Sequence, residues 1–405
     1  MISEWTPLRW PPAWRQASDL NLLKDTPVNC LVMDPGPLAE QAAKSGFQVV
    51  RPGAAPPGVV LLEGVWPGIR VSRFGAHDAA SAGPTGEPWV DSNVWPVRLA
   101  QARNPGAAIW VKTAPRDNTL LNGASLITCM ADAALAGGHW IITLTEGLAA
   151  ALAERRPDAL QTWKQIAGAA GYFSAKKEWR EYEPAAVPGI LSDFATSGSH
   201  ELLNLTTRAG QQYRVLLKEK FSARSLAGLK AVVSPDTVAP SPAIRSQVAG
   251  FVNDGGMLIA GPEWGPVPGS VLTAATHPRY SVFRLGKGSL AIAKEALTDP
   301  YLLVNDMGIL ISHRHDLLRF WNGGPLSALY SAAENREKAA VQVVFYSNRP
   351  AGVDTSLRIA GNFTTVRLST LDQPVPRALR ALQKKDAVEI NLPGTAGYIA
   401  IELEA

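Results

Sequence analysis

The first 180 residues alternate short apolar runs with segments in which apolar positions recur every three or four residues. The apolar runs predict five strands, at Asn29–Asp34, Phe47–Arg51, Val59–Glu63, Ala107–Lys112 and His139–Leu144. The periodic segments predict helices, at Pro37–Ser45, Val94–Ala102, Leu120–Ala136 and Asp158–Ala170. Buried strands separated by helices are typical of βα units with a mostly parallel sheet. Because five strands are too few for an eight-stranded barrel, we predict a reduced or irregular (β/α) barrel of the TIM type over residues 1–182.

A second alternating block begins after the charged stretch Lys176–Glu183. Its predicted strands are Val187–Ser192, Tyr213–Leu217, Ala231–Ser234 and Met257–Ala260. Its predicted helices are Ser199–Ala209 and Pro242–Asn253, and Tyr280–Lys294 has the pattern of a hairpin. This alternation predicts a separate α/β domain over residues 183–328.

The pattern changes again after the turn-forming segment Asn322–Pro325. Strand-like alternation without a long helix recurs at Val341–Tyr346, Ser356–Ile359, Thr364–Ser369, Ala387–Leu392 and Tyr398–Leu403. It predicts a small antiparallel β-sandwich over residues 329–405. The length of 405 residues agrees with an α/β multidomain protein, because single cores rarely exceed about 250–300 residues.

Charge and hydropathy exclude several classes of protein. The net charge of +4 comes from 39 basic and 35 acidic residues spread along the chain, without the basic patch that nucleic-acid binding requires. No apolar run reaches the ~18 residues of a membrane span, and residues 1–15 lack the apolar segment of a signal peptide. We therefore expect neither a nucleic-acid nor a membrane partner. The localisation is left open: cytoplasmic as written, or secreted if a leader has been removed.

The sequence predicts no cofactor and no metal. Cys30 and Cys129 form no C-x-x-C pair, and we expect both to be buried small side chains. His313 and His315 form an H-R-H triplet without a third ligand at a useful spacing, so a structural role is preferred. The absence of G-x-x-x-x-G-K-[ST], G-x-G-x-x-G and G-x-S-x-G removes the common nucleotide-binding and serine-hydrolase interpretations.

The middle block carries a resemblance to a known domain. Residues 213–265 read YRVLLKEKFSARSLAGLKAVVSPDTVAPSPAIRSQVAGFVNDGGMLIAGPEWG, with an L-x-x-L-x-A-V-V-x-P-D motif, and a later strand pair ends in RLGKGS. About residues 186–325 resemble the class I glutamine-amidotransferase-like, flavodoxin-like domain that follows the catalytic barrel in family 42 β-galactosidases and related glycoside hydrolases. Amidotransferase chemistry itself is excluded, because it needs a thiolate nucleophile and no cysteine follows Cys129.

The resemblance implies a domain order, a ligand and an assembly. In the similar hydrolases the order is barrel, amidotransferase-like domain and small β-domain, as predicted above. The resemblance implies a carbohydrate ligand and, because such relatives often associate through the middle domain, a possible homo-oligomer. Those hydrolases also carry an Asn-Glu pair at a barrel strand end. The N-terminal domain here has no such pair, so their catalytic residues cannot be carried over.

Polar residues after the predicted strands are the first candidate site residues, because functional groups in parallel α/β folds follow the carboxyl ends of strands. They are Asp34, Glu63, Lys112 and Glu146, with Trp66 in the turn after Glu63. Hydrolysis of a glycosidic bond needs two carboxyl groups, and we expect Glu63 to pair with Asp91 or Glu146. As alternatives, Glu63 could cap its turn or pair with Arg70, and Glu146 could lie in the first turn of a helix over Glu146–Glu154, where the helix dipole stabilises an acid.

The stretch GPTGEPWVDSNVW, residues 83–95, has the composition of a sugar subsite. Its carboxylates and amide can hold hydroxyl groups and its indoles can stack on a sugar ring; these residues are Glu87, Asp91, Asn93, Trp89 and Trp95. As an alternative, Asp91 or Ser92 could cap the helix that begins at Val94, with Trp95 facing the core. The two interpretations overlap, and we favour substrate binding.

Two classes of function remain open. The leading hypothesis is a glycoside hydrolase with its site at the strand ends of the N-terminal domain. The alternative is a catalytically inactive protein that binds glycans or assembles with an active partner. The missing Asn-Glu pair and the small number of strands favour the alternative, whereas the clustered carboxylates favour an enzyme.

Overall fold

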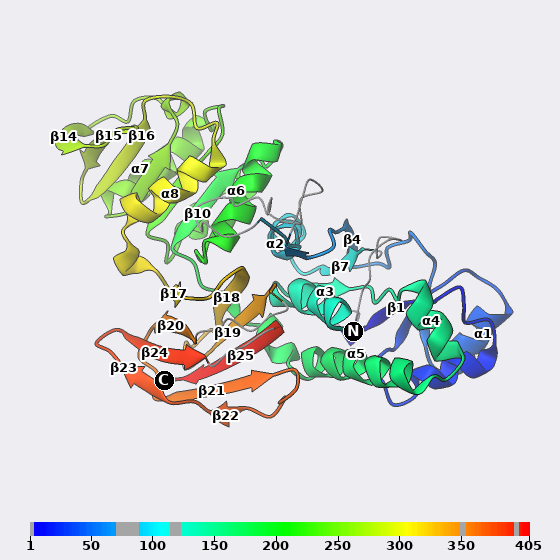
Figure 1. Ribbon diagram of the computed structural model, residues 1–405. Helices are drawn as coiled ribbons and strands as arrows, with labels where there is room; N and C mark the ends of the chain where they lie inside the picture. Colours follow the sequence, from blue (N-terminus) through cyan, green and yellow to red (C-terminus); the bar gives the residue numbers. More distant parts are fainter. Residues whose placement is uncertain (1–3, 70–88, 114–122, 348–353, 393–396) are drawn as a thin grey trace, which may run out of the picture.

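The computed structural model describes residues 4–69, 89–113, 123–347, 354–392 and 397–405. Figure 1 shows, in sequence order, a blue-to-green N-terminal part, a green-to-yellow sheet with helices on its faces, and orange-to-red strands near the C-terminus. The chain is therefore an α/β multidomain protein, as predicted. None of the described helices combines the length and apolar character that a membrane span needs.

The N-terminal part contains two three-stranded parallel ladders. One ladder consists of β1 (Pro7–Arg9), β2 (Cys30–Val32) and β3 (Gln48–Val50), and the other of β4 (Val59–Glu63), β7 (Ala108–Lys112) and β8 (His139–Trp140). A parallel bridge between Leu8 and Ile142 joins the ladders next to β1 and β8. A short antiparallel ribbon is formed by β5 (Gly68–Ile69) and β6 (Val90–Asp91). Within the described ranges no pairing joins β3 to β4, so a closed barrel is not shown.

The central strands β2 and β7 are buried on both faces. On β7, Trp110 belongs to one apolar cluster, whereas its neighbours Ile109 and Val111 belong to another. The Trp110 cluster also contains Val32 of β2 and Val59 of β4, so side chains from both ladders meet on one side. Because successive side chains point to opposite faces, a strand buried on both faces reads as a continuous apolar run. The sequence pattern therefore predicts β2 and β7 correctly, whereas β1 (Pro7–Arg9) lies outside the five predicted strands.

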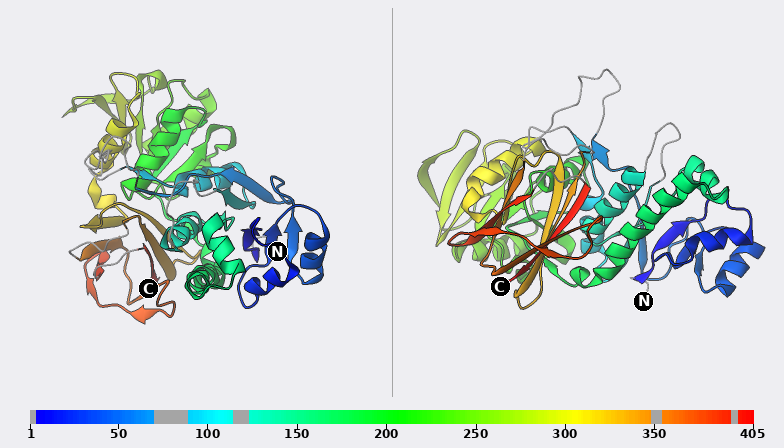
Figure 2. Two further views of the ribbon diagram at one scale, coloured as in Figure 1. Left: turned by 45° about the vertical axis from the view of Figure 1, so that its right-hand side comes forward. Right: turned by 60° about the horizontal axis from the view of Figure 1, so that its bottom comes forward.

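Helices cover the outer faces of the ladders. They are α1 (Pro37–Lys44), α2 (Val94–Arg103), α3 (Gly123–Leu135), α4 (Glu146–Ala153) and α5 (Pro157–Ala175). In Figures 1 and 2, α3 and α5 lie between the N-terminal strands and the C-terminal strands. The short 3-10 helices are η2 (Ala17–Leu23), η4 (Lys177–Arg180), η5 (Lys218–Lys220), η6 (Ala223–Leu226), η7 (Pro262–Trp264) and η8 (His313–His315).

The middle part is one seven-stranded sheet. Its spatial order is β11 (Arg214–Leu217), β10 (Pro188–Ser192), β12 (Ala231–Ser234), β13 (Met257–Ala260), β16 (Gly288–Ala293), β15 (Tyr280–Leu285) and β14 (Val271–Thr276). The first five strands are parallel and run 2-1-3-4-5 in chain order, the order of flavodoxin-like sheets. The predicted hairpin is confirmed as β15 and β16. The helices of this part are α6 (Ser197–Arg208), α7 (Pro242–Asn253) and α8 (Pro300–Ile311).

The C-terminal part consists of two antiparallel sheets that share one apolar core. One sheet contains β17 (Leu318–Trp321), β20 (Thr355–Ala360), β24 (Ala387–Leu392) and β23 (Ala381–Gln383). The other contains β22 (Arg377–Ala378), β21 (Thr365–Thr370), β25 (Gly397–Glu404), β19 (Lys338–Phe345), β18 (Leu326–Ala332) and β9 (Glu183–Pro184). On β19, Val341 and Val343 face the shared core, whereas Ala340 and Val344 face the N-terminal helices.

The strand pairing corrects the predicted boundary at residues 328 and 329. That boundary falls inside β18, and β17 also belongs to the C-terminal sheets. Likewise β9, which follows residue 182, pairs with β18. The segment Asn322–Pro325, after which the sequence pattern changes, joins β17 to β18, two strands of the C-terminal sheets.

Candidate functional site

A cleft of about 780 Å³ opens where β4 and α2 meet α6 of the middle sheet. One wall comes from the N-terminal part and consists of residues of β4, the end of β6 and the length of α2. The other wall is α6. The lining residues are Val60, Leu62, Glu63, Val65, Trp89, Asp91, Ser92, Asn93, Trp95, Pro96, Leu99, Ala100, Arg103, Asn104, His200, Glu201 and Asn204.

Glu63 and Lys112 meet at the carboxyl ends of neighbouring strands. The parallel register of β4 and β7 places the two residues opposite each other. The Nζ atom of Lys112 lies 2.6 Å from Oε1 of Glu63, and the two side chains are 48% and 79% exposed. An ion pair this exposed contributes little to stability. It does orient a carboxylate that stays accessible from the cleft.

The side chain of Asn93 forms hydrogen bonds within the protein. Its side chain is 1% exposed. Its amide nitrogen donates to the carbonyl oxygen of Val65 and to Oδ2 of Asp132, and its amide oxygen accepts from the N–H of Val65. Gly64 is required beside it, because a Cβ at that position would lie 2.6 Å from Oδ1 of Asn93. Asn93 therefore ties the turn after β4 to the junction of β6 and α2, and it also belongs to the lining of the cleft.

Asp132 of α3 lies beneath this junction and is fully buried. Its carboxylate accepts hydrogen bonds from the hydroxyl of Ser92 at 2.7 Å, from the N–H of Asn93 at 2.8 Å and from the hydroxyl of Tyr346 at 2.6 Å. Burial raises the pKa of Asp132 above its usual value, and the bonds from Tyr346 and Ser92 act in the opposite direction. The C-terminal sheet thus supports one wall of the cleft through Tyr346.

The N-cap of α2 is Asn93, so neither of the two predicted caps, Asp91 and Ser92, occupies the cap position. The hydroxyl of Ser92, one residue before the cap, accepts the N–H of Val94, the first residue of the helix. Asp91 is left at the end of β6, where it pairs with Gly68, is half-buried and lines the cleft. Ser92 therefore takes part in the buried hydrogen bonds at the start of α2, whereas Asp91 lines the cleft.

Two of the three candidate indoles line the cleft. The ring of Trp95 lies 5.1 Å from the His200 ring with an interplanar angle of 31°, and the guanidinium of Arg208 lies 5.1 Å from the ring centroid of Trp89. Both indoles are half-buried and pack against the core of the middle sheet. Trp66 is not among the lining residues and instead contacts Trp140 edge to face at 6.2 Å.

The remaining candidates lie elsewhere. Glu146 is the first residue of α4, and the hydroxyl of Thr145 caps this helix. Glu146 therefore lies in the first turn of a helix, which is the alternative considered from the sequence. Asp34 is exposed in the connection between β2 and α1. Neither Glu146 nor Asp34 lines the cleft. Glu87 and Arg70 lie outside the described residues.

The wall formed by α6 was missed by the sequence analysis. It contributes His200, Glu201 and Asn204. Asn204 is 7% exposed, and its Oδ1 atom has no hydrogen-bond partner among the described residues. A helical pattern shows that one face is buried but does not show what it packs against, so nothing in the sequence marked this residue.

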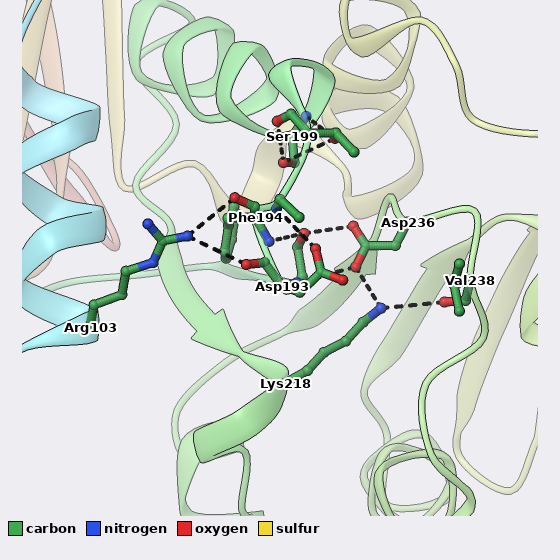
Figure 3. Close-up of polar contacts among 10 residues, drawn as sticks. Arg103, Asp193, Phe194, Ser199, Lys218, Asp236 and Val238 are labelled. Carbon is green, nitrogen blue, oxygen red and sulfur yellow. Dashed lines mark hydrogen bonds and ion pairs between the residues drawn. The ribbon is translucent and has the colours of Figure 1, made fainter.

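Hydrogen bonds to α2 and to the strand ends hold the start of α6 in place. Figure 3 shows Arg103 of α2 donating to the carbonyl oxygen of Phe194, at 3.2 Å, just before the helix. The hydroxyl of Ser192 donates to Asp236 at 2.6 Å, and Lys218 lies 2.6 Å from the same carboxylate. Phe194 has a positive φ of 53°, a conformation that these contacts stabilise. The two walls of the cleft are thus joined by direct polar contacts.

The two cysteines and the histidines of the H-R-H triplet do not line the cleft. No group of three or more His, Cys, Asp or Glu side chains in the described part of the chain could hold a metal ion. Cys30 and Cys129 are buried as predicted, and burial raises the pKa of Cys30 to about 12. His313 pairs with Asp316 at 2.8 Å within a short 3-10 turn, which agrees with a structural role.

Comparison with solved structures finds the same fold in a carbohydrate-active enzyme. The α-L-fucosidase isoenzyme 2 from Paenibacillus thiaminolyticus aligns with a TM-score of 0.54 at 11% identity, over 91% of this chain and 70% of the fucosidase. The predicted resemblance to glycoside hydrolases is therefore confirmed at the level of the fold. Models of known protein families give no match to the sequence, and no curated protein sequence matches it.

Two other enzymes align at lower TM-scores. A GH42 β-galactosidase from G. stearothermophilus aligns with a TM-score of 0.46 at 12% identity, over 82% of this chain and 62% of its own. A rhamnosidase from Novosphingobium sp. PP1Y aligns with a TM-score of 0.49 at 9% identity, over 91% of this chain and 38% of its own. This chain thus spans less than two thirds of the length of either enzyme.

Proposed function

We propose that the chain binds a carbohydrate in the cleft between β4, α2 and α6 and hydrolyses a glycosidic bond there. The observation that carries this proposal is that Glu63 and Asp91 line the same cleft. Glycoside hydrolysis needs two carboxyl groups on either side of the scissile bond. The fold shared with an α-L-fucosidase supports the same class of reaction.

The proposed carboxylate pair is Glu63 with Asp91. Lys112 orients Glu63, and the hydrogen bonds of Ser92 and Asn93 to Asp132 hold the backbone beside Asp91. Glu146, the other partner considered from the sequence, lies outside the cleft. Because neighbouring residues hold both Glu63 and Asp91, the geometry of the carboxylate pair is fixed, as catalysis requires.

The proposed substrate contacts lie on both walls. Trp89 and Trp95 supply indole surface against which the apolar face of a sugar ring can lie. Asn204 supplies a buried amide for a sugar hydroxyl. Since these groups come from different sheets, the substrate would bridge the N-terminal and middle parts.

We also propose the finer description of the architecture. The N-terminal ladders would form a reduced (β/α) barrel, in support of which β2, β4 and β7 share an inner apolar cluster. The middle sheet would be an amidotransferase-like domain, extending from about β10 to α8. The C-terminal sheets, with β9, would form the β-sandwich. A homo-oligomer through the middle domain is part of the same proposal, and the mass in solution tests it.

Hydrolysis of aryl glycosides and oligosaccharides tests the proposed activity. The panel includes fucosides, galactosides and rhamnosides, and the variants are Glu63→Gln and Asp91→Asn. We expect each variant to lose at least about 100-fold in kcat while remaining folded, because each removes one member of the pair. Glu146→Gln is the matched control, since it alters an exposed carboxylate outside the cleft. Equal losses in all three variants, or none in any, would contradict the assignment.

A binding protein without catalysis is the second candidate. It is favoured by the pairing of Glu63 with Lys112 and by the use of Asn93 within the protein. Calorimetric titration with the same oligosaccharides separates the two candidates. Binding by the wild-type chain without hydrolysis of any substrate would support the binding protein and exclude the hydrolase.

A further inference from the structure

The four-stranded C-terminal sheet carries an exposed tryptophan on its outer face. All twelve tryptophans of the chain lie within the described residues, and Trp321 of β17 is the only exposed one, at 40%. On the same strand, Leu318 is buried in the core that the two C-terminal sheets share. Because successive side chains point to opposite faces, Arg319 and Trp321 lie on the face away from that core.

The strand register places two polar side chains beside Trp321. Antiparallel pairing sets Trp321 opposite Ser356 of β20, and Ser356 opposite Asn391 of β24. The three strands are neighbours in the sheet (Figure 1), and directly opposite residues share a face, so these side chains form one row. With strands about 4.8 Å apart, the row extends over about 10 Å, which is longer than a single sugar ring.

Contacts within the sheet orient the members of this row. The guanidinium of Arg319 lies 5.5 Å from the ring centroid of Trp321, a cation–π contact that restrains the indole. The hydroxyl of Ser356 donates to Oδ1 of Asn391 at 2.9 Å. Asn391 is exposed, so its amide N–H groups can donate to a ligand, and the oxygen of Ser356 can accept from one. The row thus combines an aromatic ring with hydrogen-bonding groups of both kinds.

Charged side chains next to the row are paired with each other. Arg358 lies 3.0 Å from Asp386, and Lys384 lies 3.2 Å from Glu389. Arg358 and Glu389 are opposite each other on β20 and β24, two positions along from the row. The row of Trp321, Ser356 and Asn391 itself carries no charge. Charge complementarity therefore favours an uncharged ligand over an ionic one.

This face suits a sugar better than a protein partner. Stable protein interfaces cover about 800 Å² per partner and have an apolar centre. Among the described residues of this sheet, the only other exposed large apolar side chain is Leu382, on the opposite edge strand β23. A sugar ring instead offers an apolar C–H face to an indole and hydroxyl groups at its rim to neighbouring polar side chains.

We propose that the outer face of this sheet binds a neutral glycan chain, with one sugar ring against Trp321 and hydroxyl groups of the adjoining unit bonded to Ser356 and Asn391. None of these three residues lines the cleft between β4, α2 and α6. The glycan surface is therefore separate from the proposed glycosidase site and does not depend on it. It would hold a polysaccharide on the C-terminal part of the chain.

Electrophoresis of the full chain in native gels that contain a soluble polysaccharide tests the proposal. The probes are galactan, xylan, mixed-linkage β-glucan and polygalacturonate, and gels without polysaccharide give the reference mobility. We expect at least one neutral polysaccharide to retard the wild type. Polygalacturonate should bind at least about fivefold more weakly than the best neutral probe, because its carboxylates would lose water without gaining a partner in the row.

Variants locate the bound glycan. Trp321→Ala should raise the dissociation constant at least about tenfold, and Trp321→Phe, which keeps an aromatic ring, should lose less. Asn391→Ala should weaken binding about threefold to tenfold, because one hydrogen-bonding group is lost. Tyr301→Ala is the matched control, since Tyr301 on α8 is also 40% exposed, and it should bind like the wild type. Asn204→Leu, in the cleft, should also leave the retardation unchanged.

Several results would overturn the proposal. They are a wild type that no polysaccharide retards, tightest binding of polygalacturonate, a Trp321→Ala variant that binds like the wild type, and an equal loss in Tyr301→Ala. Sedimentation velocity separates a glycan surface from a contact between protein copies. Dissociation of a larger assembly in Trp321→Ala, with unchanged retardation by the polysaccharide, would assign the indole to such a contact instead.

Discussion

The hydroxyl of Tyr346 donates a 2.6 Å hydrogen bond to the carboxylate of Asp132, and so joins the C-terminal sheet to the helix beneath the cleft. The same carboxylate accepts from Ser92 and Asn93, which hold the junction between β6 and α2. One fully buried carboxylate thus connects a strand near the C-terminus to the proposed substrate wall. The C-terminal part would then act in positioning the cleft as well as in stability.

Tyr346→Phe tests this connection. The variant leaves Asp132 buried with one donor fewer, and we expect a loss of about 1.5–3 kcal/mol in the free energy of unfolding, measured by urea denaturation. Tyr330→Phe is the control, since Tyr330 on the other face of β18 donates only to the carbonyl oxygen of Ala360. A loss no larger than that of the control would contradict the proposed role of the Asp132 cluster.

The loss in the free energy of unfolding caused by Tyr346→Phe should also depend on pH. Burial raises the pKa of Asp132, so the unfolded chain ionises first as pH rises, and stability falls through the interval between the two pKa values. The Tyr346 bond favours the charged carboxylate and lowers that pKa. Removing the hydrogen bond should therefore lower the free energy of unfolding more at pH 8 than at pH 5. Equal costs at both pH values, in paired urea titrations, would show that the bond does not discriminate the charged form.

His139 predicts a separate dependence at acidic pH. Its pKa is lowered to about 3 by burial and by Arg180, so below the usual value of about 6.5 the unfolded chain binds a proton that the folded chain rejects. Stability is therefore complete above about pH 6.5 and falls as pH decreases toward 3. Between pH 6.5 and 4.5, we expect the free energy of unfolding to decrease by about 2 kcal/mol less in His139→Gln than in the wild type. The same change at His277, in the loop before β15, serves as the control; identical pH profiles for the His139 variant and the wild type would refute the prediction.

Strand positions could be predicted from the sequence where a run is buried on both faces. The predicted ranges for β4, β12 and β13 have the same bounds as the strands in the structure, because turns close each apolar run on both sides. By contrast, α8 was missed: apolar residues such as Leu303 and Met307 are accompanied on other faces by Ile309, which is 64% exposed, so the amphipathic period is weak.

The residues of the cleft were only partly predictable, because some of their contacts join segments that are far apart in the sequence. Glu63 and Lys112 could be placed together because both end parallel strands, and parallel strands end at the same edge of a sheet. The structural role of Asn93 could not be predicted, because its partner, Asp132, lies 39 positions away on a helix. A lone carboxylate between the small apolar residues Ala131 and Ala133 was the available signal, because buried acids are rare unless they are hydrogen-bonded.

The ion pair of Glu63 with Lys112 provides a test that separates orientation from stability. Both groups are exposed, so Lys112→Met should change the free energy of unfolding by less than about 1 kcal/mol. If the pair orients Glu63 for catalysis, kcat should fall about tenfold or more, since misplacing a catalytic group by about 1 Å has large effects. Arg156→Met removes an equally exposed ion pair, with Asp158, away from the cleft. Unchanged kcat in Lys112→Met would leave the pair without a catalytic role.

Asn204→Leu distinguishes a substrate contact from a packing residue. Leucine has the same branching and number of side-chain heavy atoms as asparagine and removes a buried Oδ1 atom that has no partner among the described residues, so the melting temperature should stay the same or rise. If Asn204 holds a sugar hydroxyl, the same change should raise KM or the dissociation constant of an oligosaccharide about tenfold. Asn104→Ala, at the rim of the cleft, breaks a local bond to Ala100 and should lower stability without that loss of affinity. A more stable Asn204→Leu variant with unaltered sugar affinity would assign Asn204 to packing alone and would leave the N-terminal wall as the whole of the substrate site.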